Sequence, residues 1–278
     1  MNIAVIGLGL IGGSMALDLN SQLKINVLGV DNNPDHAQTA LRLRLVNEVV
    51  TLDEALSKAD VLILATPVDT IEAMLPELLD RVQPSQVVID VGSTKLDICS
   101  KVANHPNRLR FVAAHPLAGT EYSGPEAALK GLFAGKKNII CHQEQSHQEG
   151  IQLAKQLFNS LGMTTYFMTA DEHDKHLAYV SHLSHVTSFT LGLTVLDIEK
   201  DEKQIFNLAS TGFASTARLA KSNPDTWSAI FNKNGKHLVE ALDQYIDKLE
   251  KFKNAIAHSD KDQMALLMKE ANDIGRFI

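Results

Sequence analysis

A histidine followed by a compact polar turn is the feature of this 278-residue sequence with the clearest potential for chemistry. His115 follows the apolar run at residues 111–114, which is typical of a buried strand, and it opens the turn at residues 115–121. An unperturbed imidazole titrates close to neutral pH, so it can take up or release a proton. Open α/β sheets bind their ligands at the carboxyl ends of strands. We therefore predict that His115 does chemistry on a bound small molecule.

A glycine-rich hexapeptide near the N-terminus predicts a dinucleotide-binding site. It follows the apolar residues 2–6 and opens a helical stretch at 13–19, which is the strand–turn–helix context that this fingerprint requires. The first glycine permits a tight turn, the second lets the backbone approach a pyrophosphate, and the third allows close helix–strand packing. The residues predicted to bind the cofactor here are Gly7, Leu8, Gly9, Leu10, Ile11 and Gly12.

Two further strand ends complete the predicted cofactor site. Asp31 follows the apolar run 25–30, where a carboxylate accepts hydrogen bonds from a ribose and repels a 2′-phosphate. No arginine follows it directly, so we predict NAD rather than NADP. The run 61–65 ends in Thr66 and Pro67, a turn that we expect to lie against the ribose or nicotinamide of the cofactor.

Four histidines lie within one predicted helical stretch: His173, His176, His182 and His185. On a straight helix, which turns about 100° per residue, the first two point to one side and the last two roughly to the other. They cannot share one four-ligand site, no cysteine lies near them, and we predict no metal. We expect His182 and His185 to bind substrate and the other two to face solvent.

For two other polar residues, the sequence pattern leaves two alternative roles open. Ser93 follows the apolar run 87–91 and either caps the next helix or reaches into the ligand crevice. Arg218 follows a segment rich in small residues at 210–217. Its guanidinium is suited to binding a carboxylate through two hydrogen bonds, although a surface position is the simpler alternative.

These residues are carried by two segments with different patterns. Residues 1–168 alternate short β-branched runs with amphipathic stretches, which predicts βαβ units and a mostly parallel sheet. The predicted strands are residues 2–6, 25–30, 61–65, 87–91, 109–113, 138–142 and 164–168. Residues 169–278 lack this pattern, and helices are predicted at 173–196, 202–209, 225–257 and 261–274. We predict a Rossmann-type doubly wound α/β sheet followed by an all-α helical domain.

The long predicted helix at 225–257 has a continuous apolar stripe. A stripe of this length packs either against a partner chain or inside a helical bundle of the same chain, and the pattern alone leaves both open. Its members are Trp227, Ile230, Phe231, Leu238, Leu242, Ile246, Leu249 and Phe252.

Composition argues against several classes of function. The formal net charge of −7 disfavours nucleic acid or an anionic membrane as the main partner. No apolar run reaches the length of a membrane span, and the apolar N-terminus lacks the basic residues of a signal peptide. Cys99 and Cys141 are too few for a disulfide framework, which predicts a reduced, cytoplasmic location.

Five motifs, in this order, resemble the prephenate/arogenate dehydrogenase family of tyrosine biosynthesis. After the glycine-rich start come Asp-x-Gly-Ser-x-Lys at 90–95, His-Pro-x-Ala-Gly-Thr-Glu at 115–121, Ser-His-Leu-x-His at 181–185, and Gly-Phe…Thr-x-Arg at 212–218. The resemblance implies an NAD-dependent oxidative decarboxylation of prephenate to 4-hydroxyphenylpyruvate, with arogenate as the alternative substrate. It also implies a homodimer joined through a helical dimerisation domain.

The same resemblance implies roles for individual residues. His115 would take the proton of the ring hydroxyl as a hydride leaves for NAD, and Ser93 would hydrogen-bond His115 or the same hydroxyl. Arg218 would hold the ring carboxylate of the substrate. The other implied pocket residues are Ser181, His182 and His185, with Thr120 and Glu121 near the substrate's side chain.

Some features depart from the family pattern and leave alternatives open. Residues 213–216 are small and uncharged where some relatives carry Lys and Asp, and Ser184 stands where many have Pro. The choice between the keto acid prephenate and the amino acid arogenate therefore stays open. We expect neither a fused mutase nor a regulatory domain, so any tyrosine feedback would act at the active site. Two other hypotheses are a different NAD-dependent hydroxyacid dehydrogenase and a non-catalytic NAD-sensing dimer.

Overall fold

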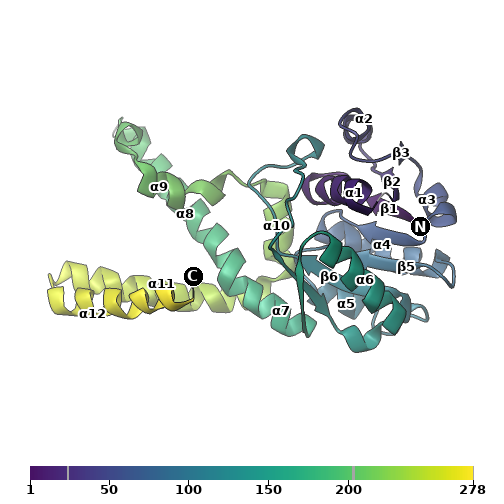
Figure 1. The fold of residues 1–278 in the computed structure, drawn as a ribbon. Helices are drawn as coiled ribbons and strands as arrows, with labels where there is room; N and C mark the ends of the chain where they lie inside the picture. The colour runs from purple at the N-terminus through teal and green to yellow at the C-terminus, as the bar shows by residue number, and fades with distance from the viewer. Residues whose placement is uncertain (24, 202–203, 278) are drawn as a thin grey trace.

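The computed structural model describes residues 1–23, 25–201 and 204–277, which form a sheet domain and projecting helices (Figure 1). The sheet has the strand order β3-β2-β1-β4-β5-β6-β7-β8. Neighbouring strands run parallel except β6 and β7, which are antiparallel. The strands are β1 (Asn2–Ile6), β2 (Asn26–Val30), β3 (Glu48–Val49), β4 (Val61–Leu64), β5 (Val87–Asp90), β6 (Phe111–Pro116), β7 (Lys137–Cys141) and β8 (Thr164–Met168).

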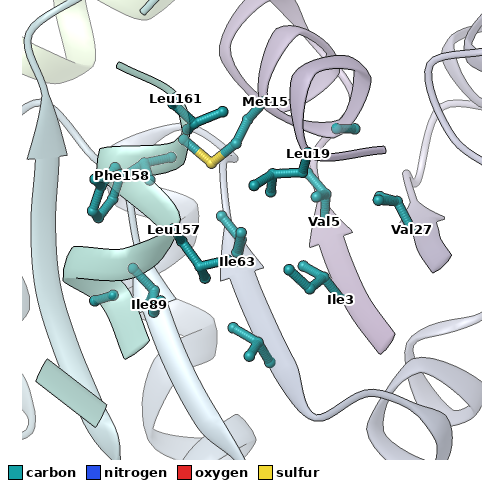
Figure 2. Close-up of a cluster of buried hydrophobic side chains, with 14 of the residues drawn as sticks. Ile3, Val5, Met15, Leu19, Val27, Ile63, Ile89, Leu157, Phe158 and Leu161 are labelled. Carbon is teal, nitrogen blue, oxygen red and sulfur yellow. The ribbon is translucent and has the colours of Figure 1, made fainter. Parts of the chain in front are cut away.

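Helices cover both faces of this sheet, as a doubly wound fold requires. On one face α1 and α6 pack against the central strands through Met15, Leu19 and Leu157 (Figure 2). On the other face α4 and α5 contribute Ile71 and Ile98. Full burial of one such side chain contributes about 1.5–3 kcal/mol, so the two apolar layers hold the sheet rigidly. The helices of this domain are α1 (Leu10–Leu23), α2 (Pro34–Arg42), α3 (Leu52–Lys58), α4 (Val68–Arg81), α5 (Leu96–Lys101) and α6 (Gln148–Ser160).

The predicted strands are all present, with ends displaced by a few residues. β6 runs from Phe111 to Pro116 rather than from 109 to 113, so His115 lies in the strand itself. It stays on the sheet beyond its parallel partner β5 because it pairs with the antiparallel β7, with His115 opposite Ile139. The short edge strand β3 and helix α2 are elements that the sequence reading did not predict.

The second half of the chain is helical. After β8 come α7 (Ala170–Leu177), a π-helical turn (Ala178–His182) and α8 (Leu183–Asp201). They are followed by α9 (Thr211–Thr216), α10 (Pro224–Lys233), α11 (Gly235–Ala257) and α12 (Lys261–Asn272). In Figure 1, α8 and the α11–α12 hairpin extend from the sheet domain as two separate arms. The predicted fold class, an α/β sheet followed by helices, is therefore present.

Two of the helix predictions were wrong in detail. The predicted single helix at 225–257 is broken at Asn234, where α10 ends and α11 begins. The predicted helix at 173–196 is interrupted by the π-helical turn at Ala178–His182. Of the predicted helix at 202–209, Glu202 and Lys203 lie outside the described residues, and the remainder contains a short 3₁₀ turn at Ile205–Leu208.

The arms expose an apolar surface. Part of the stripe predicted at 225–257 packs inside the chain, since Ile230 and Leu238 are buried, whereas Ile246 and Leu249 are exposed. Further exposed apolar side chains on the arms are Leu193, Leu196, Val239, Ile256, Leu266 and Met268. None of the described helices is both long enough and apolar enough to cross a membrane.

Candidate active site

The glycine-rich turn between β1 and α1 has the geometry of a dinucleotide cradle. Gly7 has a φ of +94°, and a side chain on it would meet the Ala65 carbonyl oxygen at 2.7 Å. A Cβ on Gly12 would lie 1.9 Å from the Gly7 carbonyl oxygen, so helix and turn pack in direct contact. At Gly9 no atom lies within 4 Å of the Cβ position. The turn is therefore closed toward the protein and open on the side where a pyrophosphate approaches.

Asp31 and Thr66 line the same edge of the sheet. The Asp31 carboxylate accepts hydrogen bonds from the Leu8 N–H at 2.8 Å and the Asn33 N–H at 2.9 Å, which ties the end of β2 to the glycine-rich turn. The Thr66 hydroxyl is buried and has no hydrogen-bond partner within the described residues. Buried hydroxyls are normally paired, so this one is available to a ligand. Both placements fit a bound NAD, and Pro67 lies exposed beside them.

Gly9 offers a test of the cofactor site. We expect Gly9→Ala to weaken NAD binding by at least tenfold, because the methyl group fills the open side of the turn that a pyrophosphate would approach. The melting temperature without NAD should change little, since the added atom contacts nothing. Isothermal titration calorimetry with NAD measures the effect, and Gly235→Ala, another site with open space, is the control. Wild-type NAD affinity in Gly9→Ala would remove this turn from the cofactor site.

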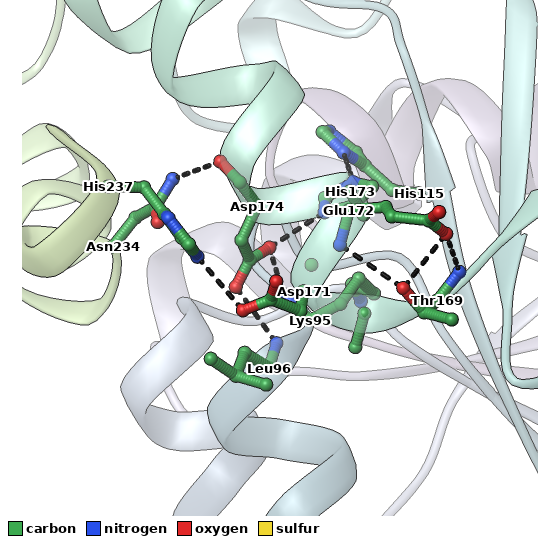
Figure 3. A network of polar contacts seen from close by, with 12 residues as sticks. Lys95, Leu96, His115, Thr169, Asp171, Glu172, His173, Asp174, Asn234 and His237 are labelled. Atoms are coloured by element: carbon green, nitrogen blue, oxygen red, sulfur yellow. Dashed lines mark hydrogen bonds and ion pairs between the residues drawn. The ribbon is translucent and has the colours of Figure 1, made fainter. Parts of the chain in front are cut away.

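His115 ends a chain of buried hydrogen bonds that starts on α7 (Figure 3). Its Nδ1 lies 2.8 Å from Nε2 of His173, and Nδ1 of His173 lies 2.7 Å from Oδ1 of Asp174. The Asp174 carboxylate also accepts the backbone N–H groups of Lys95 at 2.8 Å and Leu96 at 2.9 Å. The expectation that His173 faces solvent was therefore wrong. His176, expected on the same side, is exposed.

The surroundings of His115 keep its ring neutral. Burial, together with the positive charge that His173, Lys95 and His182 can carry, holds the pKa of His115 well below 6.5. Burial also lowers the pKa of His173, and this effect outweighs the bond to Asp174, which acts in the opposite direction. Nε2 of His115 makes no hydrogen bond within the described residues, and this atom is not completely buried. It is therefore open to a ligand.

Ser93 does not make the hydrogen bond to His115 that the family resemblance implied as one of two options. His173 takes Nδ1 of His115, and within the described residues the Ser93 side chain makes no hydrogen bond to Nε2 either. Ser93 does not cap α5 either, because the N-cap residue is Lys95 and the first N–H groups are held by Asp174. The half-buried Ser93 lies at the carboxyl end of β5, beside the end of β6.

Asp90 and Lys95, the two ends of the Asp-x-Gly-Ser-x-Lys motif, form a fully buried ion pair with each other. The Asp90 carboxylate also accepts the N–H groups of Gly92 at 2.9 Å and Ala114 at 3.2 Å. The motif thus joins the end of β5 to β6 one residue before His115. Its charged members support the site rather than contact a ligand.

Two histidines of the helical domain, His182 and His185, contact Trp227. His182 lies on the π-helical turn, is buried, and has its Nδ1 3.0 Å from Nδ2 of Asn234, while burial lowers its pKa to about 4. His185 stacks on Trp227 and donates from Nδ1 to the Ser181 carbonyl at 3.0 Å, which leaves its Nε2 for a ligand. Within the described residues, no group of three or more His, Cys, Asp or Glu side chains is arranged to hold a metal ion.

Trp227 and Asn234 are site residues that the sequence reading did not identify. Trp227 was assigned only to an apolar stripe, and Asn234 lies where a continuous helix was predicted. The one local signal was the Asn-Gly pair at 234–235, a sequence that favours turns.

Arg218 links the helical domain to the turn after β6. Its Nη1 lies 3.3 Å from Oε2 of Glu121, and its side chain is 53% exposed. Thr120 is also exposed, and its hydroxyl accepts the Tyr122 N–H at 3.2 Å. The guanidinium therefore faces the turn that follows the strand of His115, and it retains donors for a carboxylate.

Two family models match almost the whole chain. The model for the prephenate dehydrogenase nucleotide-binding domain matches residues 15–167, and the model for its dimerization domain matches residues 169–270. The chain belongs to the prephenate dehydrogenase family. The family predicted from the five motifs is thereby confirmed, as is a nucleotide-binding sheet domain followed by a helical domain.

Individual relatives agree with this assignment. The chain is 30% identical to the cyclohexadienyl dehydrogenase of Zymomonas mobilis over 97% of its length and 93% of the relative. It is 28% identical to the prephenate dehydrogenase of Bacillus subtilis over 98% of its length and 74% of the relative.

A solved structure is similar throughout. It is the prephenate dehydrogenase of Aquifex aeolicus in complex with hydroxyphenyl propionate and NAD⁺, with a TM-score of 0.90 and 29% identity, covering 99% of this chain and 97% of that one. The arogenate dehydrogenase of Synechocystis has a TM-score of 0.78 and 27% identity, with full coverage of both chains. The predicted fold class is confirmed over both halves of the chain.

Proposed function

We propose that this chain catalyses the NAD-dependent oxidative decarboxylation of prephenate to 4-hydroxyphenylpyruvate, a step of tyrosine biosynthesis. The observation that carries the proposal is the neutral, open Nε2 of His115 at the same sheet edge as the glycine-rich turn. The family match and the NAD-bound relative from Aquifex aeolicus support NAD as the cofactor. Gly7, Gly9, Gly12, Asp31 and Thr66 would hold it.

His115 would act as the base of this reaction. When bound, NAD supplies the acceptor for the hydrogen and electron pair that leave the ring carbon bearing the hydroxyl. Nε2 of His115 would take the hydroxyl proton in the same step, and Ser93 would hydrogen-bond the hydroxyl oxygen. The bond between the ring and its carboxylate then breaks, CO₂ leaves, and the ring becomes aromatic. His115 then returns the proton to the ring oxygen. The histidine therefore ends the reaction in the protonation state in which it began.

The remaining predicted residues would bind the substrate. Arg218 would hold the ring carboxylate, while Ser181, His182 and His185 would line the pocket together with Trp227. Thr120 and Glu121 would lie near the side chain. A carboxylate at Glu121 favours the ammonium group of arogenate, but its pairing with Arg218 reduces this preference, and we keep prephenate as the main substrate.

The role of Arg218 is testable by truncation. We expect Arg218→Ala to raise the KM for prephenate by about 10–100-fold, because charge-assisted hydrogen bonds contribute about 1.5–3 kcal/mol. The KM for NAD should stay within about twofold. Initial rates of NADH formation measure both constants. Arg81→Ala, which removes an arginine from another exposed ion pair, is the matched control. An unaltered KM for prephenate would exclude Arg218 from the site.

The proposed reaction itself is tested by supplying prephenate and arogenate separately, each with NAD and with NADP. We expect NADH from prephenate and NAD, and much slower turnover with NADP. Faster turnover of arogenate would make the chain an arogenate dehydrogenase. No NADH from either compound, with NAD still bound, would favour another hydroxyacid dehydrogenase or the non-catalytic NAD-sensing dimer.

We further propose that the chain forms a homodimer through its helical domain. The boundary between the two domains would lie between residues 168 and 169, and the enzyme would act in the cytoplasm. The match to the dimerization-domain model and the exposed apolar side chains of α11 and α12 support the dimer. A solution mass near the 30.4 kDa of a single chain, by light scattering, would contradict it.

A further inference from the structure

We propose that His173 and Asp174 are positioning residues that hold His115 in the one tautomer able to accept a proton from the substrate. The inference rests on the proposed function, in which His115 is the base. Neither residue was expected at the site from the sequence. Both lie on α7 of the helical domain, whereas His115 lies on β6 of the sheet domain (Figure 3).

The direction of the first hydrogen bond is set by Asp174. Its two carboxylate oxygens accept the backbone N–H groups of Lys95 and Leu96, which can only donate. With these donors on both oxygens, the carboxylate acts as an acceptor for its third partner as well. Nδ1 of His173, 2.7 Å away, must therefore carry the proton of that bond.

The second hydrogen bond then has only one possible direction. A neutral imidazole that donates from one nitrogen accepts at the other, so Nε2 of His173 is an acceptor. Nδ1 of His115, 2.8 Å away, must donate to it. The lone pair of His115 is consequently on Nε2, which is the nitrogen without a protein partner. With the opposite tautomer, two lone pairs would face each other in a buried space.

Burial makes this arrangement stable. His173 and Asp174 are fully or almost fully buried, and the two imidazole rings meet edge to face with centroids 5.0 Å apart. Nδ2 of Asn234 donates to the main-chain carbonyl of Asp174 at 2.7 Å, which anchors α7 to the start of α11. Within the described residues, the other titratable groups that act on His115 are Lys95, which is paired with Asp90, and His182.

Three variants separate positioning from structural support. We expect His173→Leu, which removes the acceptor for His115, to lower kcat by about 10²-fold with little change in the KM for prephenate or NAD. His173→Gln should keep kcat within about tenfold of wild type, because its amide oxygen can accept from Nδ1 of His115. His176→Leu, the same substitution at an exposed histidine of α7, should match wild type.

The tautomer can be read directly by NMR of protein with ¹⁵N-labelled histidine. The ring signals of His115 are assigned as those that disappear in His115→Asn. We expect Nδ1 to be protonated and Nε2 unprotonated in wild type and in His173→Gln. In His173→Leu we expect a mixture of tautomers, together with a shifted acidic limb in the pH profile of kcat/KM.

The outcomes that overturn the proposal are distinct. Unprotonated Nδ1 of His115 in the wild type contradicts it directly, whether or not the His173 variants fold. Wild-type kcat in His173→Leu also contradicts it. Equal losses in the Leu and Gln variants, with an unchanged His115 tautomer and a lower melting temperature, would indicate a structural role only. If His115→Asn retains full turnover, the proposed role of His115 as the base fails instead. The NMR result then still shows whether His173 and Asp174 set the tautomer of His115.

Discussion

Replacing His115 with Asn is expected to lower kcat by about 10²–10⁴-fold, the contribution typical of a general base. Asn is of similar polarity and smaller than His, and its amide cannot take up a proton at neutral pH. NAD binding should be unchanged, because His115 lies on β6 and the glycine-rich turn follows β1. Single-turnover and steady-state rates of NADH formation, with calorimetry for NAD, measure the two effects.

The pH profile gives an independent check on the same residue. Burial lowers the pKa of His115, so the neutral base persists below pH 6.5, and the acidic limb of kcat/KM should lie well below that value. In His115→Asn this limb should disappear. His176→Asn, at an exposed histidine, should behave as wild type. Full turnover in His115→Asn would contradict its role as the base.

Replacing Asp90 with Asn is expected to lower the free energy of unfolding by about 3–5 kcal/mol, the effect of leaving one member of a buried ion pair without its partner. The ammonium group of Lys95 and the carboxylate of Asp90 are both completely buried. Burial raises the pKa of Asp90, while Lys95 and the N–H groups of Gly92 and Ala114 act in the opposite direction. Urea denaturation followed by circular dichroism measures the loss.

Two controls make this result specific. Asp53→Asn removes a carboxylate from the exposed pair with Arg81 and should change the free energy of unfolding by about 1 kcal/mol or less. Adding Lys95→Met to Asp90→Asn should recover part of the stability, because no unpaired charge then remains buried. Equal effects of Asp90→Asn and Asp53→Asn would show that the buried pair has no special role.

The parts of the site that the sequence predicted are contiguous in the chain. A strand, a glycine-rich turn and a helix form one local unit, so the spacing of Gly7, Gly9 and Gly12 was enough to predict the turn. His115 was likewise placed by the apolar run before it. The strand pattern missed β3 because a two-residue edge strand is too short for a periodic signal.

The wrong predictions arose where the outcome depends on contacts between residues far apart in the chain. Apolar spacing continues across Asn234, so the pattern predicted one helix where the structure has two. A helical wheel assigned His173 to solvent because it assumes one straight helix and cannot identify the neighbours of each side. In the structure that side of α7 packs against α5 and β7, and His173 meets a residue 58 positions away.

The sequence by itself determined the dinucleotide turn, the division into an α/β half and a helical half, and the histidine that we propose as the base, since each depends on interactions between residues close in the chain. The tertiary structure decided what surrounds that histidine. His173, Asp174, Trp227 and Asn234 reach the site only when the helical domain packs against the end of β6. The protonation state and tautomer of His115 follow from burial and from hydrogen bonds between distant residues, and neither quantity exists until the chain is folded.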